Sequence, residues 1–409
     1  MRFKALFGLL AAGLMVTSAG NATELEVTHW WTSGGEAAAV AEFAKAFDAS
    51  GDKWIDGAIA GSGGTARPIM ISRITGGDPM GATQFNHGKQ ALELVEAGLM
   101  LDLTDVAEAN NWKEIIFPKS LLDACTVDGR IYCAPVNIHS PEWLWISNKV
   151  YEDIGIPVPK NWNEFVASAP QVEAAGKIPL ALGNQPWQSN LAFGAITTAV
   201  AGLDIWKAVN VQKDMGVAAG PEMAAVFEAA SSARKLAAKS TVQDWNQATN
   251  LVITDQAAGQ IMGDWAQGEF QVAQEVAGKD YTCLPGLGLN AYLSTGGDAF
   301  YFPKLDDDEK EAAQKRLAAL LVSPEVQVAF NLKKGSLPIR GDVNLSAAND
   351  CMKKGLDLLA SGNILPSGDM VWSPDVMTQA ADLMVEFWKS DMPAGEAHKR
   401  WVAILETGL

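Results

Sequence analysis

The feature that most constrains the fold of this 409-residue chain is a strand–turn–helix pattern that repeats near its N-terminus. Short apolar stretches of strand character cover residues 25–29, 55–60 and 82–85, and a helical pattern follows each of them. Strands that alternate with helices of this length predict βαβ units and a mostly parallel sheet. In such a sheet the ligand site lies beyond the carboxyl ends of the strands, where the helices begin.

Three strand-to-helix turns should therefore meet at one edge of the same domain. They are Trp30-Trp31, Gly61–Gly64 and Gln84–Lys89. The glycine-rich turn lacks the Gly-Lys-Ser/Thr ending of a phosphate-binding loop and the spaced GxGxxG pattern of a dinucleotide site. We expect a ligand other than a nucleotide at this edge.

Two adjacent tryptophans, Trp30 and Trp31, end the first expected strand, and Glu36 opens the helix that follows. Adjacent residues of a strand face opposite ways, so both indoles cannot enter the same core. An indole presented at the turn beside a carboxylate suits a sugar, whose C–H face stacks on the ring while its hydroxyls bind the acceptor. The alternative is that one ring is core and the other covers the strand end. This stretch alone does not decide between the two interpretations.

Composition and charge limit the function classes. The length allows two or three domains with a large core. The net charge is −17 and no basic block occurs, which argues against binding a nucleic acid backbone. Fourteen tryptophans against five tyrosines indicate stacking surfaces in addition to core packing.

The N-terminus has the pattern of a secretory signal peptide over residues 1–22. Arg2 and Lys4 precede an apolar run, 5–16, that is too short to span a bilayer, and 20–22 fits a cleavage site. No later segment is long and apolar enough to span. We therefore expect a soluble, exported, periplasmic protein.

The four cysteines agree with an oxidising compartment. Cys125 and Cys133 flank the hairpin turn signal Asp128-Gly129, so their thiols should face each other across paired strands. We expect that disulfide and a second one, Cys283–Cys351, which closes a long loop. The spacing suits no zinc site, and we expect neither a metal nor a cofactor.

A second α/β region begins near residue 140. Expected strands cover 142–148, 178–181 and 261–265, with helical patterns between about 189 and 252. Residues 135–140 are the candidate crossover, and 281–303 has the character of a return to the first region. From Asn344 the pattern is helical to the end of the chain.

Five segments, in this order, together resemble one family. They are Trp30-Trp31 with Glu36; Gly76-Gly77-Asp78-Pro79; Pro135–His139; Met262-Gly263-Asp264-Trp265; and Ser323–Gln327 through Gly335–Arg340. They resemble the family 1 extracellular solute-binding proteins of ABC sugar importers, and most of all the glucose/mannose-binding branch. The resemblance covers essentially the whole mature chain. It implies the type II periplasmic binding protein fold, in which two α/β lobes joined by hinge strands close on the sugar.

The resemblance also implies lobe boundaries and ligand-binding residues. The N-terminal lobe should comprise 23–136 with about 289–340, and the C-terminal lobe 137–288 with about 341–409. The implied ligand-binding residues are Trp30, Trp31, Glu36, Gln84, Asn86, Lys89, Trp245, Asp298 and Lys334, with Trp265 and His139 as secondary candidates. Trp245 is expected to oppose the tryptophan pair from the second lobe, whereas hinge packing is favoured over ligand contact for His139.

The chain departs from the branch at two histidines. One is expected in the turn after Gln84, where Asn86 stands nearer the expected place and His87 is shifted. Another is expected near the C-terminus, where Pro366-Ser367-Gly368-Asp369 stands instead. These departures leave the class of ligand intact and put the identity of the sugar in doubt.

The function that these features predict is sugar binding without catalysis. A monomer would bind an aldohexose such as glucose or mannose and deliver it to an inner-membrane permease and its ATPase. One alternative is a binding protein for a different sugar or a polyol. Another is a secreted glycoside hydrolase, which needs two carboxylates that flank the bond. Glu36 and Asp298 are available, but the two-region pattern argues against a barrel hydrolase.

Overall fold

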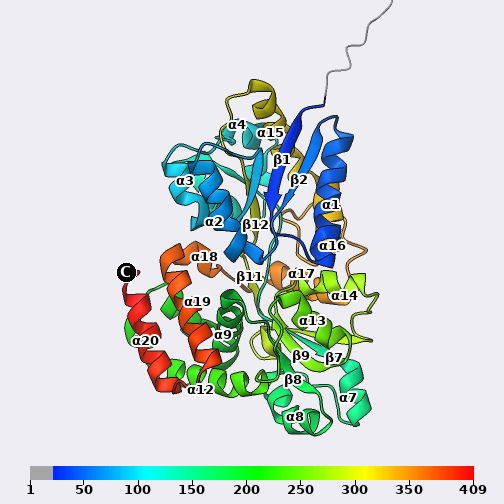
Figure 1. Ribbon diagram of the computed structural model, residues 1–409, viewed down its shortest axis with the longest axis vertical. Helices are drawn as coiled ribbons and strands as arrows, with labels where there is room; N and C mark the ends of the chain where they lie inside the picture. Colours follow the sequence, from blue (N-terminus) through cyan, green and yellow to red (C-terminus); the bar gives the residue numbers. More distant parts are fainter. Residues whose placement is uncertain (1–21) are drawn as a thin grey trace, which may run out of the picture.

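The computed structural model describes residues 22–409 and shows two α/β lobes arranged along the long axis of the molecule (Figure 1). All but the last residue of the expected signal peptide, 1–22, lies outside the described residues. Within residues 22–409, no helix has the length and hydropathy needed to cross a membrane. The mixed α/β class and the two lobes confirm the predicted fold.

The first lobe is built on a five-stranded sheet. In spatial order its strands are β2 (Lys53–Ala58), β1 (Glu24–His29), β3 (Ala82–Asn86), β12 (Asp298–Tyr301) and β6 (Cys133–Pro135). β1 pairs in parallel with β2 and β3, whereas β12 pairs antiparallel with β3 and β6. The expected βαβ units are therefore present. The carboxyl ends of the three parallel strands lie at the sheet edge that faces the second lobe (Figure 1).

Helices flank this sheet and bury its apolar side chains. They are α1 (Gly34–Ala49), α2 (Ser62–Thr75), η1 (Lys89–Ala91), α3 (Leu92–Glu96), α4 (Thr104–Ala109), α5 (Trp112–Ile115), α6 (Ser120–Asp123), α15 (Asp308–Leu321) and α16 (Pro324–Lys334). Local sequence sets their ends. The Ser33 side chain caps α1 by accepting from the amide of Glu36, and Gly335, with φ of +84°, ends α16 in a left-handed conformation.

The second lobe has a four-stranded sheet in the order β10 (Tyr281–Pro285), β7 (Trp143–Ser147), β9 (Ala257–Met262) and β8 (Ile178–Ala181). Its helices are α7 (Asn148–Ile154), α8 (Trp162–Ala174), α9 (Pro186–Ala201), α10 (Leu203–Asn210), α11 (Met215–Ala218), α12 (Pro221–Leu236), α13 (Trp245–Ile253), α14 (Ala266–Val272), η2 (Gly286–Gly288), α19 (Pro374–Lys389) and α20 (Ala394–Glu406). The strand expected at 261–265 is wrong in its bounds. The chain leaves the sheet after Met262 because it turns at Gly263, whose carbonyl accepts from the amide of Ala266 at 3.1 Å.

Segments far apart in the sequence meet between the lobes. Ile138 forms a β-bridge with Leu337, and the next residue, His139, forms one with Gly296. The short strand β11 (Leu293–Ser294) pairs in parallel with β13 (Ile364–Leu365). The crossover expected at 135–140 and the return after residue 281 therefore lie side by side, with α18 (Gly368–Val371) close by along the chain.

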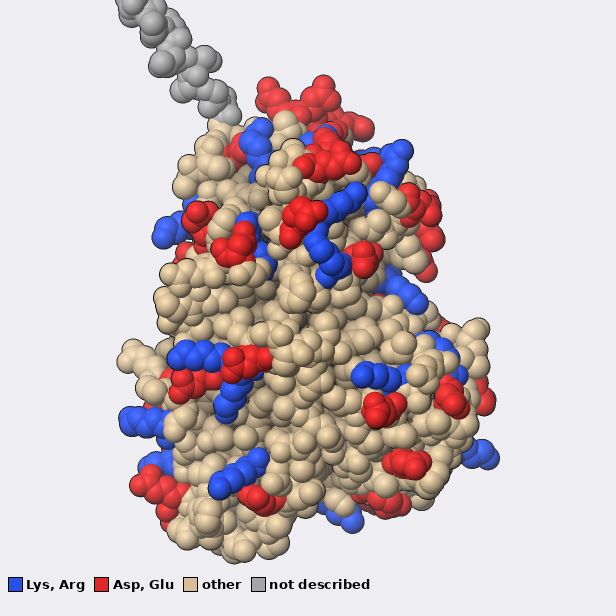
Figure 2. Space-filling model, turned by 180° about the vertical axis from the view of Figure 1, so that it is seen from behind, with Lys and Arg blue, Asp and Glu red and all other residues tan. Residues whose placement is uncertain are grey.

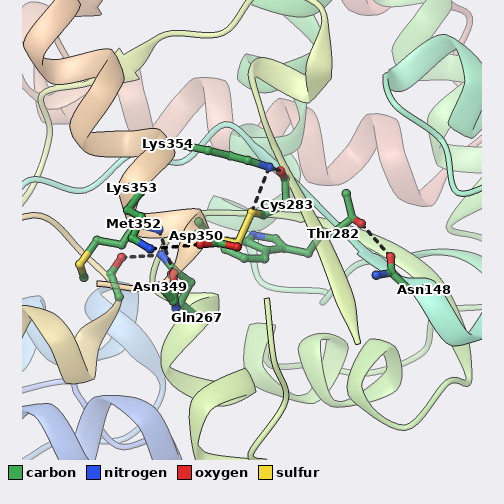
Figure 3. Close-up of a disulfide and its surroundings, with 12 residues drawn as sticks. Asn148, Gln267, Thr282, Cys283, Asn349, Asp350, Met352, Lys353 and Lys354 are labelled. Carbon is green, nitrogen blue, oxygen red and sulfur yellow. Dashed lines mark hydrogen bonds and ion pairs between the residues drawn. A yellow bond between two sulfur atoms is a disulfide. The ribbon is translucent and has the colours of Figure 1, made fainter. Parts of the chain in front are cut away.

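Both expected disulfides are confirmed. Cys125–Cys133 closes the hairpin of β4 (Thr126–Val127) and β5 (Arg130–Ile131), and Cys283–Cys351 joins β10 to α17 (Asp350–Ser361; Figure 3). Beside the second disulfide, the Lys354 ammonium donates to the carbonyl of Cys283 at 2.8 Å. Met352, also on α17, packs into the core of the first lobe. Helix α17 therefore contacts both lobes, and the boundary expected near residue 340 remains a prediction.

Charge is mixed over the surface rather than concentrated. On the face drawn in Figure 2, Lys and Arg side chains stand among Asp and Glu side chains, and a band across the middle is largely uncharged. With a net charge of −17, this face offers no continuous basic track for a phosphate backbone.

Candidate functional site

A chain of hydrogen bonds crosses the edge of the first sheet that faces the second lobe. The amide of Trp30 donates to Gln84 Oε1 at 2.9 Å, and Gln84 Nε2 donates to Asp298 Oδ1 at 2.8 Å. Gln84 and Asp298 are buried on the paired strands β3 and β12. Both ends of the Gln84 amide are thus used inside the protein, where they position Trp30 and Asp298.

His139 joins the two lobes through two carboxylates. Its Nδ1 lies 2.7 Å from Asp264 Oδ1 of the second lobe, and its Nε2 lies 2.9 Å from Asp298 Oδ2 of the first. Asn137 Nδ2 also donates to Asp298 Oδ2, at 2.9 Å. Burial opposes the charged form of each group, but His139 and Lys334 lower the pKa of Asp298 to about 2, and the carboxylates raise the pKa of His139. His139 thus lies where the two lobes meet, and both of its ring nitrogens contact groups within the protein.

Lys334 and Glu36 form a buried ion pair at the same edge. Lys334 Nζ lies 2.8 Å from Glu36 Oε1, and the Ser33 hydroxyl donates to Glu36 Oε2 at 3.2 Å. The ammonium also lies 5.9 Å from the ring centroids of both Trp31 and Trp265. One cation thus stands between aromatic rings that come from different lobes.

Two of the expected stacking surfaces are not open in this conformation. Trp31 is 1% exposed and packs among Phe43, Phe300 and Phe330, with ring centroids 5.2–6.2 Å away. Trp245 is 6% exposed and meets Trp265 edge-on at 6.5 Å. Both are core residues because the helices and strands of their own lobes cover them. Direct contact of these two indoles with a ligand, which the sequence analysis expects, remains a prediction.

Three other indoles at the lobe interface are half-buried. Trp30 belongs to the first lobe, and Trp187 and Trp265 to the second. Trp265 lies 6.2 Å from Trp187 and 5.0 Å from the ring of His139, which it meets edge-on. Sequence reasoning did not include Trp187, although the signal was present, since it directly follows Gln185-Pro186 in the turn after the expected strand 178–181.

Asn86 and Lys89 make contacts within the protein. Asn86 Nδ2 donates to the carbonyl of Gly297 at 3.2 Å, and Lys89 Nζ lies 3.5 Å from the carbonyl of Val371 in α18. Both residues border the group around Asp298, and contact with a ligand remains a prediction for each.

His87, which is not among the ligand-binding residues expected from the sequence, is a further candidate. Its ring is fully buried, and neither Nδ1 nor Nε2 has a hydrogen-bond partner in the part of the chain that the structure describes. Burial lowers its pKa to about 4 despite the nearby charge of Asp298, so the ring is neutral at pH 7. The useful signal was its place directly after β3, at the edge where the other candidates gather.

The lobes contact each other around these residues. Ser62 Oγ donates to Gln185 Oε1 at 3.0 Å, Gln90 Nε2 donates to Asp369 Oδ1 at 3.0 Å, and the amide of Gly35 donates to Glu269 Oε1 at 2.8 Å. The interface between the lobes therefore brings together anionic acceptors, cationic donors and partly open indole faces.

This two-lobed arrangement, with its polar and aromatic groups at the lobe interface, defines a solute-binding protein. Residues 29–328 match the family of bacterial extracellular solute-binding proteins, and the chain belongs to this family. Its members are binding proteins and not enzymes, so the hydrolase alternative is set aside.

Related proteins match over most of the chain. A protein of Rhizobium meliloti (strain 1021) described as a probable sugar-binding periplasmic protein is 35% identical over 364 residues, which are 88% of this chain and 87% of the relative. A solved chitin oligosaccharide binding protein has a TM-score of 0.77 at 18% identity, covering 95% of this chain and 99% of its own. The solute receptor AcbH, described as having an exclusive preference for b-D-galactopyranose, has a TM-score of 0.75 at 19% identity, covering 95% and 99%. At these identities the two solved structures show the likeness of fold alone.

Proposed function

We propose that this solute-binding protein is the periplasmic sugar-binding component of an ABC importer and that it binds an aldohexose such as glucose or mannose. The observation that carries the proposal is the meeting of Glu36, Lys334 and Asp298 with half-buried indoles of both lobes. The name of the Rhizobium relative supports a sugar as the ligand.

The groups at the interface have the chemistry that a pyranose needs. Carboxylates accept from sugar hydroxyls in charge-assisted hydrogen bonds, and an ammonium donates to ring or hydroxyl oxygens. Asp298 is ionised at neutral pH, because its pKa is lowered to about 2. Neutral His87 adds a donor and an acceptor, and Trp30 and Trp265 offer apolar faces for C–H groups.

A small ligand agrees with how closely the lobes approach each other. The contacts Ser62–Gln185, Gln90–Asp369 and Gly35–Glu269 lie on different elements around the candidate residues. Contacts on several sides favour a monosaccharide over an extended chain. Binding of a different sugar or a polyol is the alternative.

The roles of the predicted residues divide into two groups. We propose that Trp30, Glu36, Asp298, Lys334, Trp265, His87 and Trp187 face the sugar. Gln84, His139, Trp31 and Trp245 hold those side chains in place from behind. Asn86 and Lys89 stay at the border of the site.

Transport then follows from closure rather than from chemistry. The sugar stabilises the closed lobes by its differential affinity for that state, and closure replaces water around the ring by fixed polar groups. The closed monomer would be the form that the permease and its ATPase receive.

Calorimetric titration tests the proposal. Glucose, mannose, galactose, xylose, two disaccharides and a polyol should be titrated into the purified mature protein, with Trp265→Ala as a variant of a proposed contact. We expect heat with an aldohexose and a weaker response in the variant. Binding of only disaccharides or polyols would contradict the aldohexose assignment, and absence of any sugar response would contradict the function itself.

A further inference from the structure

Arg67, in α2 at the lobe interface, is a cation without a hydrogen-bond or ion-pair partner among the described residues. Its guanidinium carbon lies 5.8 Å from the ring centroid of Trp30, and the side chain is only partly exposed. Among residues 22–409, no hydrogen bond and no ion pair within 4.0 Å reaches this guanidinium, although it carries five N–H donors. Withdrawing such a group from water is unfavourable unless something accepts from it.

The glycine-rich turn before Arg67 holds the guanidinium next to Trp30. A Cβ atom at Gly63 would lie 2.5 Å from Arg67 Nη1 and 3.4 Å from Trp30 Cε2. Any larger residue at Gly63 would require the flexible end of Arg67 to shift away from its place beside Trp30. The space beside Gly63 thus gives a structural role to the segment Gly61–Gly64, which has no phosphate-binding pattern.

Asp369, in α18, provides a carboxylate that faces the same guanidinium. Its Oδ1 accepts from Gln90 Nε2 at 3.0 Å. Burial raises the pKa of Asp369, and the charge of Arg67 opposes that effect, so the two groups are near enough to interact. They nevertheless do not form a direct ion pair within 4.0 Å, so neither charge is neutralised by direct contact with the other.

We infer that Arg67 and Asp369 are specificity-determining residues that together bind one hydroxyl, or two adjacent hydroxyls, of the sugar. A hydroxyl accepts from a guanidinium and donates to a carboxylate at the same time, which suits a pair held close but not joined. An anionic ligand group would bind Arg67 but would be repelled by Asp369 and Asp298. The structure therefore favours a neutral sugar with a free hydroxyl at this end. The inference rests on the proposed function and refines it.

The proposed contact of one hydroxyl with Arg67 and Asp369 would also join the two lobes. Arg67 lies in the first lobe, whereas the chain after Asp369 enters the second core at Val371 and Trp372. A hydroxyl held by both residues would tie α2 to α18, and so this end of the sugar would favour closure.

The test is a thermodynamic cycle between residue and hydroxyl. The aldohexose that binds best and its mono-deoxy analogues should be titrated into wild type, Arg67→Met and Asp369→Asn. We expect each variant to weaken binding of the parent sugar roughly tenfold to a hundredfold. Removing one particular hydroxyl from the sugar should weaken binding to wild type by a similar factor. The same deoxy analogue should bind Arg67→Met about as well as the parent sugar does. Arg73→Met is the matched control, because Arg73 lies on the same helix but pairs with Glu26 at 2.6 Å.

The outcomes separate this inference from the proposed function. The assignment of Arg67 is overturned, while sugar binding stands, if Arg67→Met binds the parent sugar with an affinity within threefold of wild type. It is also overturned if every deoxy analogue loses as much affinity in Arg67→Met as it does in wild type. If wild type binds no sugar, both fail. Thermal melting shows whether each variant folds, and Arg67→Lys, which keeps the charge, should recover part of the affinity.

Discussion

Lys334 Nζ lies 2.8 Å from Glu36 Oε1, although the two residues are 298 positions apart in the sequence. The side chains are only 2% and 9% exposed, so this ion pair is almost completely withdrawn from water. The pair joins the end of α16 to the first turn of α1. Removing one partner of a buried pair leaves an uncompensated charge, which is more costly than removing both.

We therefore expect Lys334→Met to lower the free energy of unfolding by roughly 3–5 kcal/mol. The double variant Glu36→Gln/Lys334→Met should lose clearly less, because no buried charge remains unpaired. Urea denaturation of both proteins measures the difference. A single variant as stable as wild type, or a double variant worse than the single one, would contradict this account.

Asp298 should make stability depend on pH in the acid range. Burial alone would raise its pKa, but His139, Lys334 and the hydrogen bond from Asn137 lower it to about 2. The unfolded value is about 3.9, so the ionised form stabilises the fold above about pH 4. That contribution, about 2.6 kcal/mol, is lost as the pH falls toward 2. Asp298→Asn should lack this part of the slope in denaturation curves taken at each pH, and an unchanged slope would refute it.

The contribution of His139 to stability should depend on pH in the opposite direction, and near neutral pH. Burial lowers its pKa, as does Lys334, but Asp264 and Asp298 outweigh both effects and the net pKa is raised. The charged ring therefore stabilises the fold fully below the unfolded pKa of about 6.5. The contribution is lost as the pH rises through the folded value. The difference in unfolding free energy between wild type and His139→Gln should shrink between pH 6 and 9; growth of that difference would be incompatible with the charged ring.

Adjacent Trp30 and Trp31 should respond differently to truncation. Trp31→Ala removes a fully buried ring and should cost roughly 3–5 kcal/mol of stability. Trp30→Ala removes a half-buried ring and should weaken sugar binding with a much smaller loss of stability. Melting curves and calorimetric titration of the two variants provide the comparison. Equal stability losses, or intact sugar affinity in Trp30→Ala, would mean that the assignment of the two rings is wrong.

Periodicity in the sequence predicted the architecture because it reports on local structure. The parallel strands, the crossover at 135–140 and the Cys125–Cys133 disulfide follow from patterns within short stretches, whereas Cys283–Cys351 was expected because only these two cysteines remained. Strand alternation likewise predicted that Trp30 and Trp31 face opposite ways. Which of them enters the core depends on α1 and α16, whose packing places Phe43 and Phe330 against Trp31, and local pattern does not contain that information.

The site was harder to predict because it forms from distant segments. Arg67 and Asp369 are both ordinary charged residues in their own stretches, and only the fold brings α2 close to α18. The family pattern draws attention to Asn86 rather than to His87, and only the fold shows that the His87 ring at the end of β3 lacks a hydrogen-bond partner among the described residues.

The two disulfides should stabilise the protein unequally. Cys125–Cys133 spans 8 residues, whereas Cys283–Cys351 spans 68. Loop-closure entropy in the unfolded chain predicts contributions of about 2.5 and about 4.4 kcal/mol. The Cys→Ser double variants should show this order in urea denaturation. The reverse order would contradict the entropic account. The stability would then depend on native contacts of α17, such as that of Lys354 with Cys283.

Gly35 should control how closely the lobes approach. A Cβ atom at this position would lie 2.4 Å from the carbonyl carbon of Gly268 in α14. The backbone fixes the positions of both atoms, so no rotamer change can relieve this contact. Gly35→Ala must therefore separate α1 from α14 and weaken the contact of the Gly35 amide with Glu269. We expect sugar affinity to fall by roughly tenfold, or about 1.4 kcal/mol, and the radius of gyration with saturating sugar to rise in X-ray scattering.

Gly64→Ala is the control for that variant, because Gly64 lies in α2 and a Cβ there meets no atom within 4 Å. It should bind sugar like wild type and, since alanine favours helix, should be slightly more stable. If Gly35→Ala also bound sugar with unchanged affinity, the α1–α14 contact would be irrelevant to ligand capture. Closure would then have to depend on the other lobe contacts, Ser62 with Gln185 and Gln90 with Asp369.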